Sequence, residues 1–302
     1  MGGRAGAEGA TVPGMPAHPL LLSLSLAACA GEGAVRSTDT IDASDSGGAQ
    51  DSGPDDTSTA LPELPTSGCG GASYEWLPRA QTGEVVSAER DAVYSLSAGT
   101  LDVLLAAQGL ERFTPVPYGV ELYRVRYTTQ DRGELIEVTG YAAFPNVSEP
   151  TSVPLLLWLH PTMGFSDACA PTAIGLAGAA FPVLMASLGY AVAAPDFIGM
   201  NGWGPASDRP HPWAVAEPTA IASLDMGRAT IALAANLALP ATPDPARTVA
   251  WGASQGGHAA LFVDRYAPGY APALTPKAVV AAIPPTDLRA LASHGVQEWG
   301  AT

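Results

Sequence analysis

The sequence is poor in basic residues, in long apolar runs and in cysteine, and each shortage excludes a class of protein. Its 14 lysines and arginines face 29 aspartates and glutamates, which gives a net charge of −15. Because nucleic acid phosphates need a basic surface, this balance argues against a nucleic acid partner. No run approaches the roughly 20 apolar residues that a membrane-spanning helix needs. Histidine, cysteine and carboxylate residues nowhere share metal-ligand spacing, and no phosphate-cradling loop occurs, so we expect neither metal nor cofactor.

The first of the three cysteines follows a short apolar run near the N-terminus. Residues 20–28 are typical of a signal-peptide core, and small residues stand directly before Cys29. This pattern resembles the lipobox of bacterial lipoproteins. We therefore expect residues 1–28 to be a lipoprotein signal peptide and Cys29 to be acylated, so that a lipid anchors the exported protein to the membrane of a bacterial envelope. Ala30 favours the outer membrane, and a plain secretory signal with an incidental cysteine is the alternative.

Cys69 and Cys169 remain once Cys29 is assigned to the anchor. Two cysteines in an exported protein favour one disulfide. Closing a loop of about 100 residues would stabilise the fold by roughly 4 kcal/mol on the chain-entropy model. Two free, buried thiols are the alternative.

Much of the acidity is confined to one stretch behind the signal. Residues 31–68 hold eight carboxylates and one arginine, so they carry about −7 of the net −15. Their Ser, Thr, Asp, Gly and Pro residues cannot bury enough surface to offset the entropy of ordering. We therefore expect residues 29–68 to be a disordered acidic tether and residues 69–302 to form the globular domain.

Short apolar strands alternate with helical runs through the globular part. We expect strands at residues 119–128, 135–144, 154–159, 190–194, 248–251 and 277–283, and helices at residues 101–108, 219–237 and 288–294. A further helix should end at Gly189, the helix 288–294 should stop at Gly295, and residues 130–133 should form a hairpin turn. This alternation predicts an α/β fold with a mostly parallel, doubly wound sheet and helices on both of its faces.

Residues 252–256 carry the pattern G-x-S-x-G between a buried strand and an Ala-rich helical run. This context is typical of the nucleophile elbow of an α/β-hydrolase, in which a sharp turn holds a serine clear of the sheet. Gly252 and Gly256 lack Cβ atoms, so strand and helix can pass close together while Ser254 takes a strained conformation. We therefore predict that Ser254 is a nucleophile, and an ordinary strand–helix turn is the alternative.

Six segments in order extend this likeness beyond the elbow. They are LWLHPTMG at residues 157–164, CAPT at 169–172, APDFIGM at 194–200, HPW at 211–213, WGASQGGH at 251–258 and IPPTDL at 283–288. Together, from about residue 99 to residue 295, they resemble the secretory lipase family, whose fungal members include the lipase-A type enzymes. The resemblance implies an α/β-hydrolase fold and a serine carboxylic-ester hydrolase, a lipase or esterase, that acts on small-molecule or lipid esters.

The family pattern also implies a role for several residues. Ser254 would attack the ester carbonyl to form an acyl-enzyme, which water then hydrolyses. The backbone N–H of Gln255 would be one donor of the oxyanion hole. The second donor lies in the loop after the strand 154–159, where the family resembles His-Gly-Thr and residues 160–162 read HPT. The proline has no N–H, so we expect Thr162 to be the second donor.

Other polar residues have more ordinary explanations. His160 precedes the serine, in the wrong chain order for the proton-transferring histidine of this fold, and we expect it to brace the oxyanion loop. We expect a packed or capped imidazole at His258 and a turn or loop brace at Asp196. Asp225 can form an ion pair on its own helix, and His211 lies in a proline-rich loop.

The acid and the base of a triad are hard to find in the sequence. In this fold they follow the serine, in the order Ser, Asp or Glu, His. Only 48 residues follow Ser254, and they offer Asp287, Glu298 and His294. Asp287 is a weak candidate for the acid, because it opens a helix, where an aspartate caps backbone N–H groups. We therefore expect the acid, the base and the last strands of the sheet to lie beyond Thr302, which would leave a sheet edge uncovered.

Two other functions stay open on these observations. An inactive, truncated chain or a non-enzymatic envelope lipoprotein would use the hydrolase fold for binding. An acyltransferase or a serine peptidase would share the elbow and differ in the bond cleaved or in the acceptor.

Overall fold

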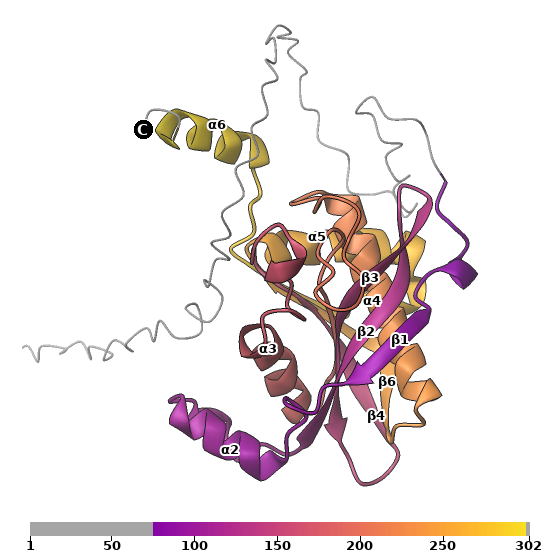
Figure 1. Ribbon diagram of the computed structural model, residues 1–302, viewed down its shortest axis with the longest axis vertical. Coiled ribbons are helices and arrows are strands. Elements are labelled where there is room, and N and C mark those ends of the chain that lie inside the picture. The colour runs from indigo at the N-terminus through magenta and orange to yellow at the C-terminus, as the bar shows by residue number, and fades with distance from the viewer. Residues whose placement is uncertain (1–74, 300–302) are drawn as a thin grey trace, which may run out of the picture.

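The computed structural model describes residues 75–299, and Figure 1 shows a central sheet with helices on both sides. Seven strands form the sheet in the order β1-β2-β3-β5-β4-β6-β7. They are β1 (Val85–Arg90), β2 (Gly119–Asp131), β3 (Glu134–Asn146), β4 (Thr151–Leu159), β5 (Ala191–Pro195), β6 (Ala241–Ala253) and β7 (Ala278–Ala282).

Five of the seven strands point the same way. β5, β4, β6 and β7 are parallel neighbours, whereas β1, β2, β3 and β5 pair antiparallel, so that β1 and β3 are the two reversed strands. This confirms the predicted α/β fold with a mostly parallel sheet. The expected hairpin joins β2 to β3 through Arg132 and Gly133, whose φ angles of 49° and 76° suit a two-residue hairpin turn.

Helices cover both faces of the sheet, as predicted. They are α2 (Ala98–Ala107), α3 (Leu176–Ser187), α4 (Ala216–Asn236), α5 (Gln255–Tyr270) and α6 (Leu288–Trp299), with the 3-10 turns η1 (Arg79–Gln81), η2 (Glu111–Phe113), η3 (Asp167–Cys169) and η4 (Pro272–Leu274). α2 and α3 share one apolar core with the sheet, and α4 and α5 share the other. In Figure 1, α6 stands away from the sheet.

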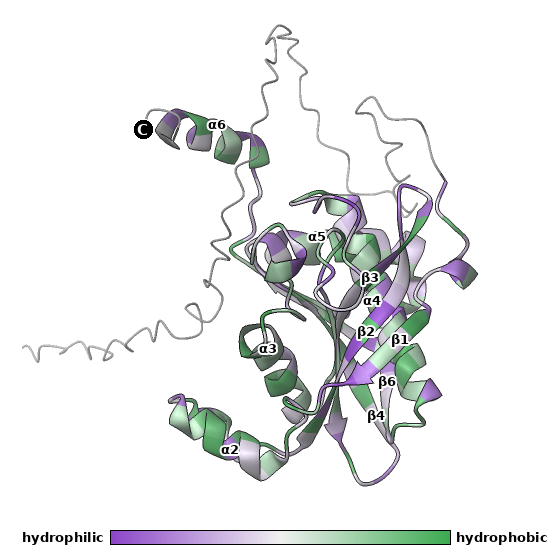
Figure 2. Ribbon diagram, viewed as in Figure 1, coloured by the Kyte–Doolittle hydropathy of each residue, from purple (hydrophilic) through white to green (hydrophobic). Residues whose placement is uncertain are grey.

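Alternate side chains of β4 enter these two cores. Leu155, Leu157 and Leu159 pack with α4 and α5, and Leu156 and Trp158 pack with α3 on the opposite face. α3 itself is coloured hydrophobic over most of its length in Figure 2. All five β4 side chains are buried, each worth roughly 2 kcal/mol relative to an exposed position. β4 is therefore covered on both faces and gives a fixed support to the loop that follows it.

Two glycines near helix ends behave differently. α3 ends at Ser187, and Gly189 follows with a φ of 100°, which is the left-handed cap that the sequence predicts. α6 instead continues through Gly295 to Trp299, so the predicted stop at Gly295 is wrong. A glycine costs a helix interior only about 1 kcal/mol, which is too little to end a helix by itself.

A buried polar network ties α4 to β2 and α5. Asp225 pairs with Arg228 on its own helix at 2.7 Å, as expected. Its other carboxylate oxygen accepts hydrogen bonds from Thr129 on β2 at 2.7 Å and from Tyr270 on α5 at 2.8 Å. Burial raises the pKa of Asp225 to about 6, while the Arg228 guanidinium acts in the opposite direction.

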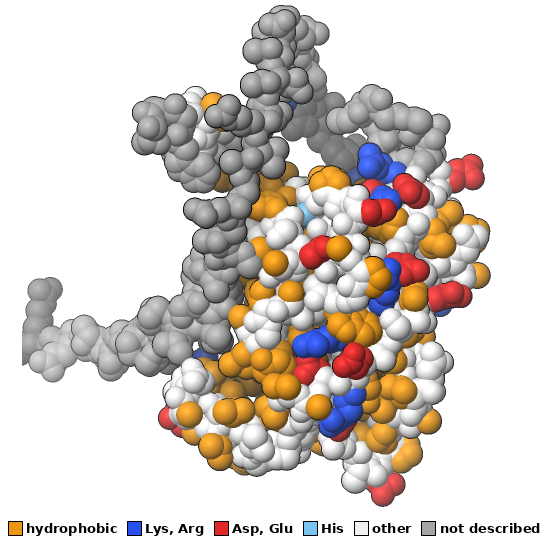
Figure 3. Space-filling model, in the orientation of Figure 1, with side chains coloured by type: hydrophobic (Ala, Val, Ile, Leu, Met, Phe, Trp, Pro, Cys, Tyr) orange, Lys and Arg blue, Asp and Glu red, His pale blue; other side chains and the backbone are white. Residues whose placement is uncertain are grey.

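Charges of both signs are mixed over the face that carries β1 and β2 (Figure 3). Arg90 pairs with Glu121 and Arg126 with Glu137, each across neighbouring strands. Arg124 pairs with the buried carboxylate of Asp91 at 3.0 Å. Alternation of this kind gives no basic surface on this face.

Several predictions concern residues outside the described range. The signal 1–28, the tether 29–68 and the acylated Cys29 all lie there, so these remain predictions. Cys169 is buried with a free thiol, whereas its predicted partner Cys69 lies outside the described residues, and the pairing also stays a prediction. Within residues 75–299, no helix combines the length and the apolar character that crossing a bilayer requires.

Candidate active site

Ser254 occupies the turn between β6 and α5 in a strained backbone conformation. Its φ of 54° and ψ of −119° lie where residues with a side chain are rarely found. Two hydrogen bonds hold it there: its N–H donates to the Ala282 carbonyl at 2.9 Å, and the His258 N–H donates to the Ser254 carbonyl at 3.0 Å. The serine is partly exposed at the carboxyl end of β6. This is the backbone geometry expected of a nucleophile elbow.

Three glycines allow the backbone of the elbow to approach the neighbouring strands closely. A Cβ on Gly252 would collide with the backbone of Gly256, and a Cβ on Gly256 would collide with the carbonyl of Leu159 at the end of β4. A Cβ on Gly257 would lie 2.7 Å from the Ala282 carbonyl oxygen. The turn is therefore pressed directly against the end of β4, where the predicted oxyanion loop begins.

Thr162 lies in that loop, and its side chain already has a partner. Thr162 Oγ1 accepts a hydrogen bond from Trp213 Nε1 at 2.9 Å. The backbone N–H groups of Thr162 and Gln255 donate to no other residue among those the structure describes. Gln255 begins α5, where the first amides of a helix lack intrahelical acceptors. Within residues 75–299, both predicted oxyanion donors therefore have an N–H without a partner.

His160 is fully buried between the ends of β4 and β5. Its Nδ1 lies 2.7 Å from the Pro161 carbonyl oxygen and its Nε2 lies 3.2 Å from the Asp196 carbonyl oxygen. Burial lowers the pKa of His160 to about 4, so the ring is neutral at pH 7 and donates one N–H. The ring packs on Phe197, with centroids 4.2 Å apart. These contacts agree with a bracing role.

Asp196 is also fully buried, directly after β5. Its carboxylate accepts hydrogen bonds from the Thr139 hydroxyl at 2.5 Å, from the Thr172 N–H at 2.9 Å and from the Thr172 hydroxyl. Burial raises the pKa of Asp196 to about 6, and these hydrogen bonds act in the opposite direction. With its oxygens occupied in this way, Asp196 ties the loop after β5 to β3 and to the loop after η3, which agrees with the predicted brace.

His211 contacts the residue that follows the nucleophile. Gln255 Nε2 lies 2.7 Å from His211 Nε2, and His211 Nδ1 lies 2.8 Å from the Ile198 carbonyl oxygen. A carbonyl cannot donate, so Nδ1 carries the proton and Nε2 accepts from the Gln255 amide. Burial lowers the pKa of His211, which favours this neutral form. No sequence signal other than the family-like HPW segment marks this residue.

Within the described range, no hydrogen bond joins the side chains of the remaining candidates to Ser254. His258 is buried with its ring against Phe262, at 4.6 Å between centroids. Asp287 is exposed and accepts a hydrogen bond from the Ala290 N–H at 2.8 Å, which is a helix cap. His294 is exposed on α6. Residues 75–299 contain no cluster of three or more potential metal ligands.

Part of the chain matches a known protein family. Residues 178–295, which include the elbow, match the model of the family described as secretory lipase. This part of the chain is therefore similar to the secretory lipases. Thr162 and His160 precede the matched segment, so the family match does not bear on their roles.

Solved structures of hydrolases share the fold. A protein of Legionella pneumophila, provisionally described as a hydrolase, is 24% identical with a TM-score of 0.57 over 67% of this chain and 52% of that one. The rice cell wall degrading esterase LipA from Xanthomonas oryzae, in a ligand-bound form, is 21% identical with a TM-score of 0.57 over 72% and 54%. Candida antarctica lipase A in its closed state is a looser match, with a TM-score of 0.43.

The chain spans about half the length of the hydrolases whose fold it shares. No curated protein matches it. The segment that matches the family model holds the turn at Ser254 together with α5 and β7.

Proposed function

We propose that the chain is a serine carboxylic-ester hydrolase that forms its acyl-enzyme on Ser254. The observation that carries this proposal is the strained turn of Ser254, pressed by glycines against the end of β4. Backbone strain of this kind costs about 1–3 kcal/mol and clusters at functional sites. The secretory lipase match over the elbow supports the same chemistry.

The reaction would proceed through a tetrahedral intermediate. Ser254 Oγ bonds to the ester carbonyl carbon while its proton passes to a general base and the carbonyl π electrons move to oxygen. The N–H groups of Gln255 and Thr162 donate to that oxyanion, each worth about 3 kcal/mol. The intermediate collapses and the alcohol leaves with the proton. Water then attacks the acyl-enzyme in the same way and releases the acid.

Ester cleavage is the chemistry shared by the proteins that this chain resembles. The matched family is one of secretory lipases, and the neighbour from Xanthomonas oryzae is a rice cell wall degrading esterase. We therefore infer a carboxylic ester as the substrate. The preferred length of the acyl chain can be measured with a series of p-nitrophenyl esters, from acetate to palmitate.

The general base has no assignment among the described residues. His160 and His211 face carbonyl or amide groups with both ring nitrogens, and His294 lies on exposed α6. A non-enzymatic protein that binds ligands through the hydrolase fold is the second candidate.

The test treats the full chain with a fluorophosphonate probe and identifies the labelled peptide by mass spectrometry. We expect a label on Ser254 and hydrolysis of p-nitrophenyl esters, both lost in Ser254→Ala. Ser223→Ala is the matched control, because the Ser223 hydroxyl is buried in α4 and donates to the Thr219 carbonyl. Absence of label, together with equal hydrolysis by wild type and Ser254→Ala, would contradict the enzyme and favour the binding protein. Transfer to an added alcohol, or cleavage of an amide, would instead indicate an acyltransferase or a peptidase.

We also propose that the protein is exported and anchored by a lipid on Cys29. Support comes from the lipobox-like residues before Cys29 and from the match to a family of secretory enzymes. Metabolic labelling with an alkyne fatty acid should mark the wild type and not Cys29→Ser. A labelled Cys29→Ser variant would refute the anchor site.

A further inference from the structure

One short segment touches the side chains of both proposed oxyanion donors. Residues 211–213 lie in the loop between β5 and α4. His211 accepts from Gln255 Nε2 at 2.7 Å, and Trp213 Nε1 donates to Thr162 Oγ1 at 2.9 Å. The two donors follow different strands, β6 and β4, and no hydrogen bond joins their own side chains within the described residues. The segment is therefore a bridge between them.

The segment is held rigidly at its own backbone. The Trp213 N–H donates to the His211 carbonyl at 2.9 Å, and the Val215 N–H donates to the Pro212 carbonyl at 3.1 Å. Pro212 fixes its own φ between the two bridging residues. Gly199 lies so close that a Cβ there would come within 2.5 Å of the His211 Cα. These contacts leave the segment little freedom to move relative to β5.

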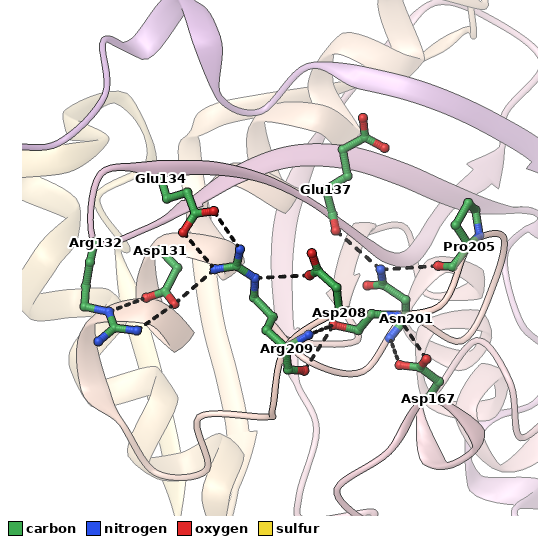
Figure 4. A network of polar contacts seen from close by, with 10 residues as sticks. Asp131, Arg132, Glu134, Glu137, Asp167, Asn201, Pro205, Asp208 and Arg209 are labelled. Atoms are coloured by element: carbon green, nitrogen blue, oxygen red, sulfur yellow. Dashed lines mark hydrogen bonds and ion pairs between the residues drawn. The ribbon is translucent and has the colours of Figure 1, made fainter.

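Polar contacts fix the rest of the same loop (Figure 4). Arg209, two residues before His211, pairs with Glu134 at 3.0 Å and with Asp131 at 3.5 Å on the β2–β3 hairpin. Asp167 accepts hydrogen bonds from the Asn201 N–H at 2.7 Å and from the Ser207 N–H at 3.0 Å. The loop is thus tied both to the hairpin and to η3.

Aromatic rings join the segment to the loop that carries Thr162. Phe165 lies 6.3 Å from the His211 ring and 6.4 Å from the Trp213 ring, measured between centroids. Phe197 also stacks with His211, with centroids 6.2 Å apart and an interplanar angle of 11°. His211 is consequently fixed by packing as well as by its two hydrogen bonds.

We propose that residues 211–213 position the two oxyanion donors as a pair, His211 through Gln255 and Trp213 through Thr162. The inference rests on the proposed function, because it assumes that these donors serve an acyl transfer at Ser254. His211 and Trp213 are positioning residues that do not touch the reacting atoms themselves. Displacing either donor weakens binding of the oxyanion, which exists only in the transition state, so kcat falls while KM changes little.

The first experiment is a double-mutant cycle between Trp213→Phe and Thr162→Val. Trp213→Phe keeps an aromatic ring and removes the N–H, and Thr162→Val keeps the shape and removes the hydroxyl. We expect each variant to label with fluorophosphonate about 10-fold more slowly and to lose about 10-fold in kcat. The double variant should be no slower than the worse single variant, because both remove the same hydrogen bond. Thr162→Ser, which retains a hydroxyl, should recover most of the loss.

Trp76→Phe is the matched control for loss of an indole hydrogen bond. Trp76 Nε1 donates to Glu217 at 3.0 Å, and its ring packs on Tyr270 at the far end of α5 from Ser254. We expect wild-type labelling from this variant. Additive losses from Trp213→Phe and Thr162→Val would overturn the proposal and assign Trp213 to contact with the substrate.

A second readout does not depend on activity. The amide cross-peaks of Thr162 and of Gln255 in ¹H–¹⁵N NMR spectra should both shift in Trp213→Phe, because one segment holds both residues. The same changes are expected in His211→Phe, with the larger effect at Gln255. Unchanged chemical shifts at both amides would overturn the proposal even if Ser254 labels normally. If Ser254 takes no label while both cross-peaks shift, the proposed function fails and the contacts of the segment stand.

Discussion

At the scale of single residues, Asp196 and His160 respond to pH in opposite directions although they lie at neighbouring strand ends. Burial raises the pKa of Asp196 to about 6 and lowers the pKa of His160 to about 4. Between those values the folded protein holds more protons at Asp196, and fewer at His160, than the unfolded chain does. As pH rises from 4 to 6, the stability due to Asp196 therefore falls and that due to His160 rises.

Asp196→Asn should isolate the first of these effects. The rise of its pKa from the ordinary 3.8 to about 6 corresponds to roughly 3 kcal/mol. As pH rises from 4 to 7, we expect the free energy of unfolding of the variant to increase relative to that of the wild type by up to roughly that amount. Urea unfolding measures this difference. Asp208→Asn, whose side chain is 88% exposed, should show no such gain. A difference between Asp196→Asn and wild type that is independent of pH would contradict the prediction.

Residues could be predicted from the sequence where their surroundings are local in the chain. Ser254, Gly252 and Gly256 form one short motif, and the conformation predicted for them is the one observed. His211 and Trp213 could not be given roles, because their partners Gln255 and Thr162 lie 44 and 51 residues away. Such a contact depends on the completed sheet and leaves no periodic signal in the chain.

At the scale of elements, the elbow depends on a close approach of backbone to backbone. Gly256→Ala would place a Cβ against the Leu159 carbonyl, and neither backbone can yield without moving β4 or α5. We expect this variant to lose about 3 kcal/mol of stability or to fail to fold, as measured by thermal and urea unfolding. Gly99→Ala, in α2, has no atom within 4 Å of the new Cβ and should be neutral or slightly stabilising. Equal stability of the two variants would show that the elbow tolerates separation from β4.

Six of the seven strands were predicted, whereas β1 and the full length of β6 were not. Residues 248–251 read as a strand because they are apolar, but β6 begins at Ala241. Its first half contains Pro243 and Pro245, which lack N–H groups and argue against a strand when read alone. The pairing with β4 accommodates them through a register shift between Pro154 and Leu155. Only the partner strand makes this half of β6 possible.

At the scale of the whole molecule, the buried charge of Asp225 joins α4 to β2 and to α5. Asp225→Ala leaves the Arg228 guanidinium, whose side chain is only 9% exposed, without its counter-ion. We expect a loss of about 3–5 kcal/mol in urea unfolding. The double variant Asp225→Ala with Arg228→Met should be less destabilised than Asp225→Ala alone, because no unpaired charge remains. If the stability losses of the two single variants simply add in the double variant, Asp225 and Arg228 contribute to stability independently.

The edge of the sheet at β7 gives a prediction about association. Within the described residues β7 pairs only with β6, and Val280 on it is 43% exposed. Open, apolar edges promote pairing between molecules, and a lysine on such a strand opposes it. We expect Val280→Lys to reduce concentration-dependent association in sedimentation velocity. Val93→Lys, at a site that is 70% exposed in a turn, should leave association unchanged.

The arrangement of the molecule followed from the sequence more completely than the site did. The alternation of apolar strands and helical runs predicts parallel strands with helices on both faces, and the chain has that architecture. The network around Asp225 was predicted only as its pair with Arg228, since Thr129 and Tyr270 approach from other elements. Local sequence patterns predict which residues form strands and helices. Polar contacts between elements that are distant in the sequence depend on how those elements pack.

The burial of the imidazoles gives the protein an uneven reactivity toward diethyl pyrocarbonate. His294 is exposed and should be carbethoxylated at once. His160 and His211 are buried, and their ring nitrogens are occupied by neighbouring groups. Their modification has to wait for transient opening of the loops around them. The rate of the slow phase would then report how often the loops beside Ser254 open, without the need for any substrate.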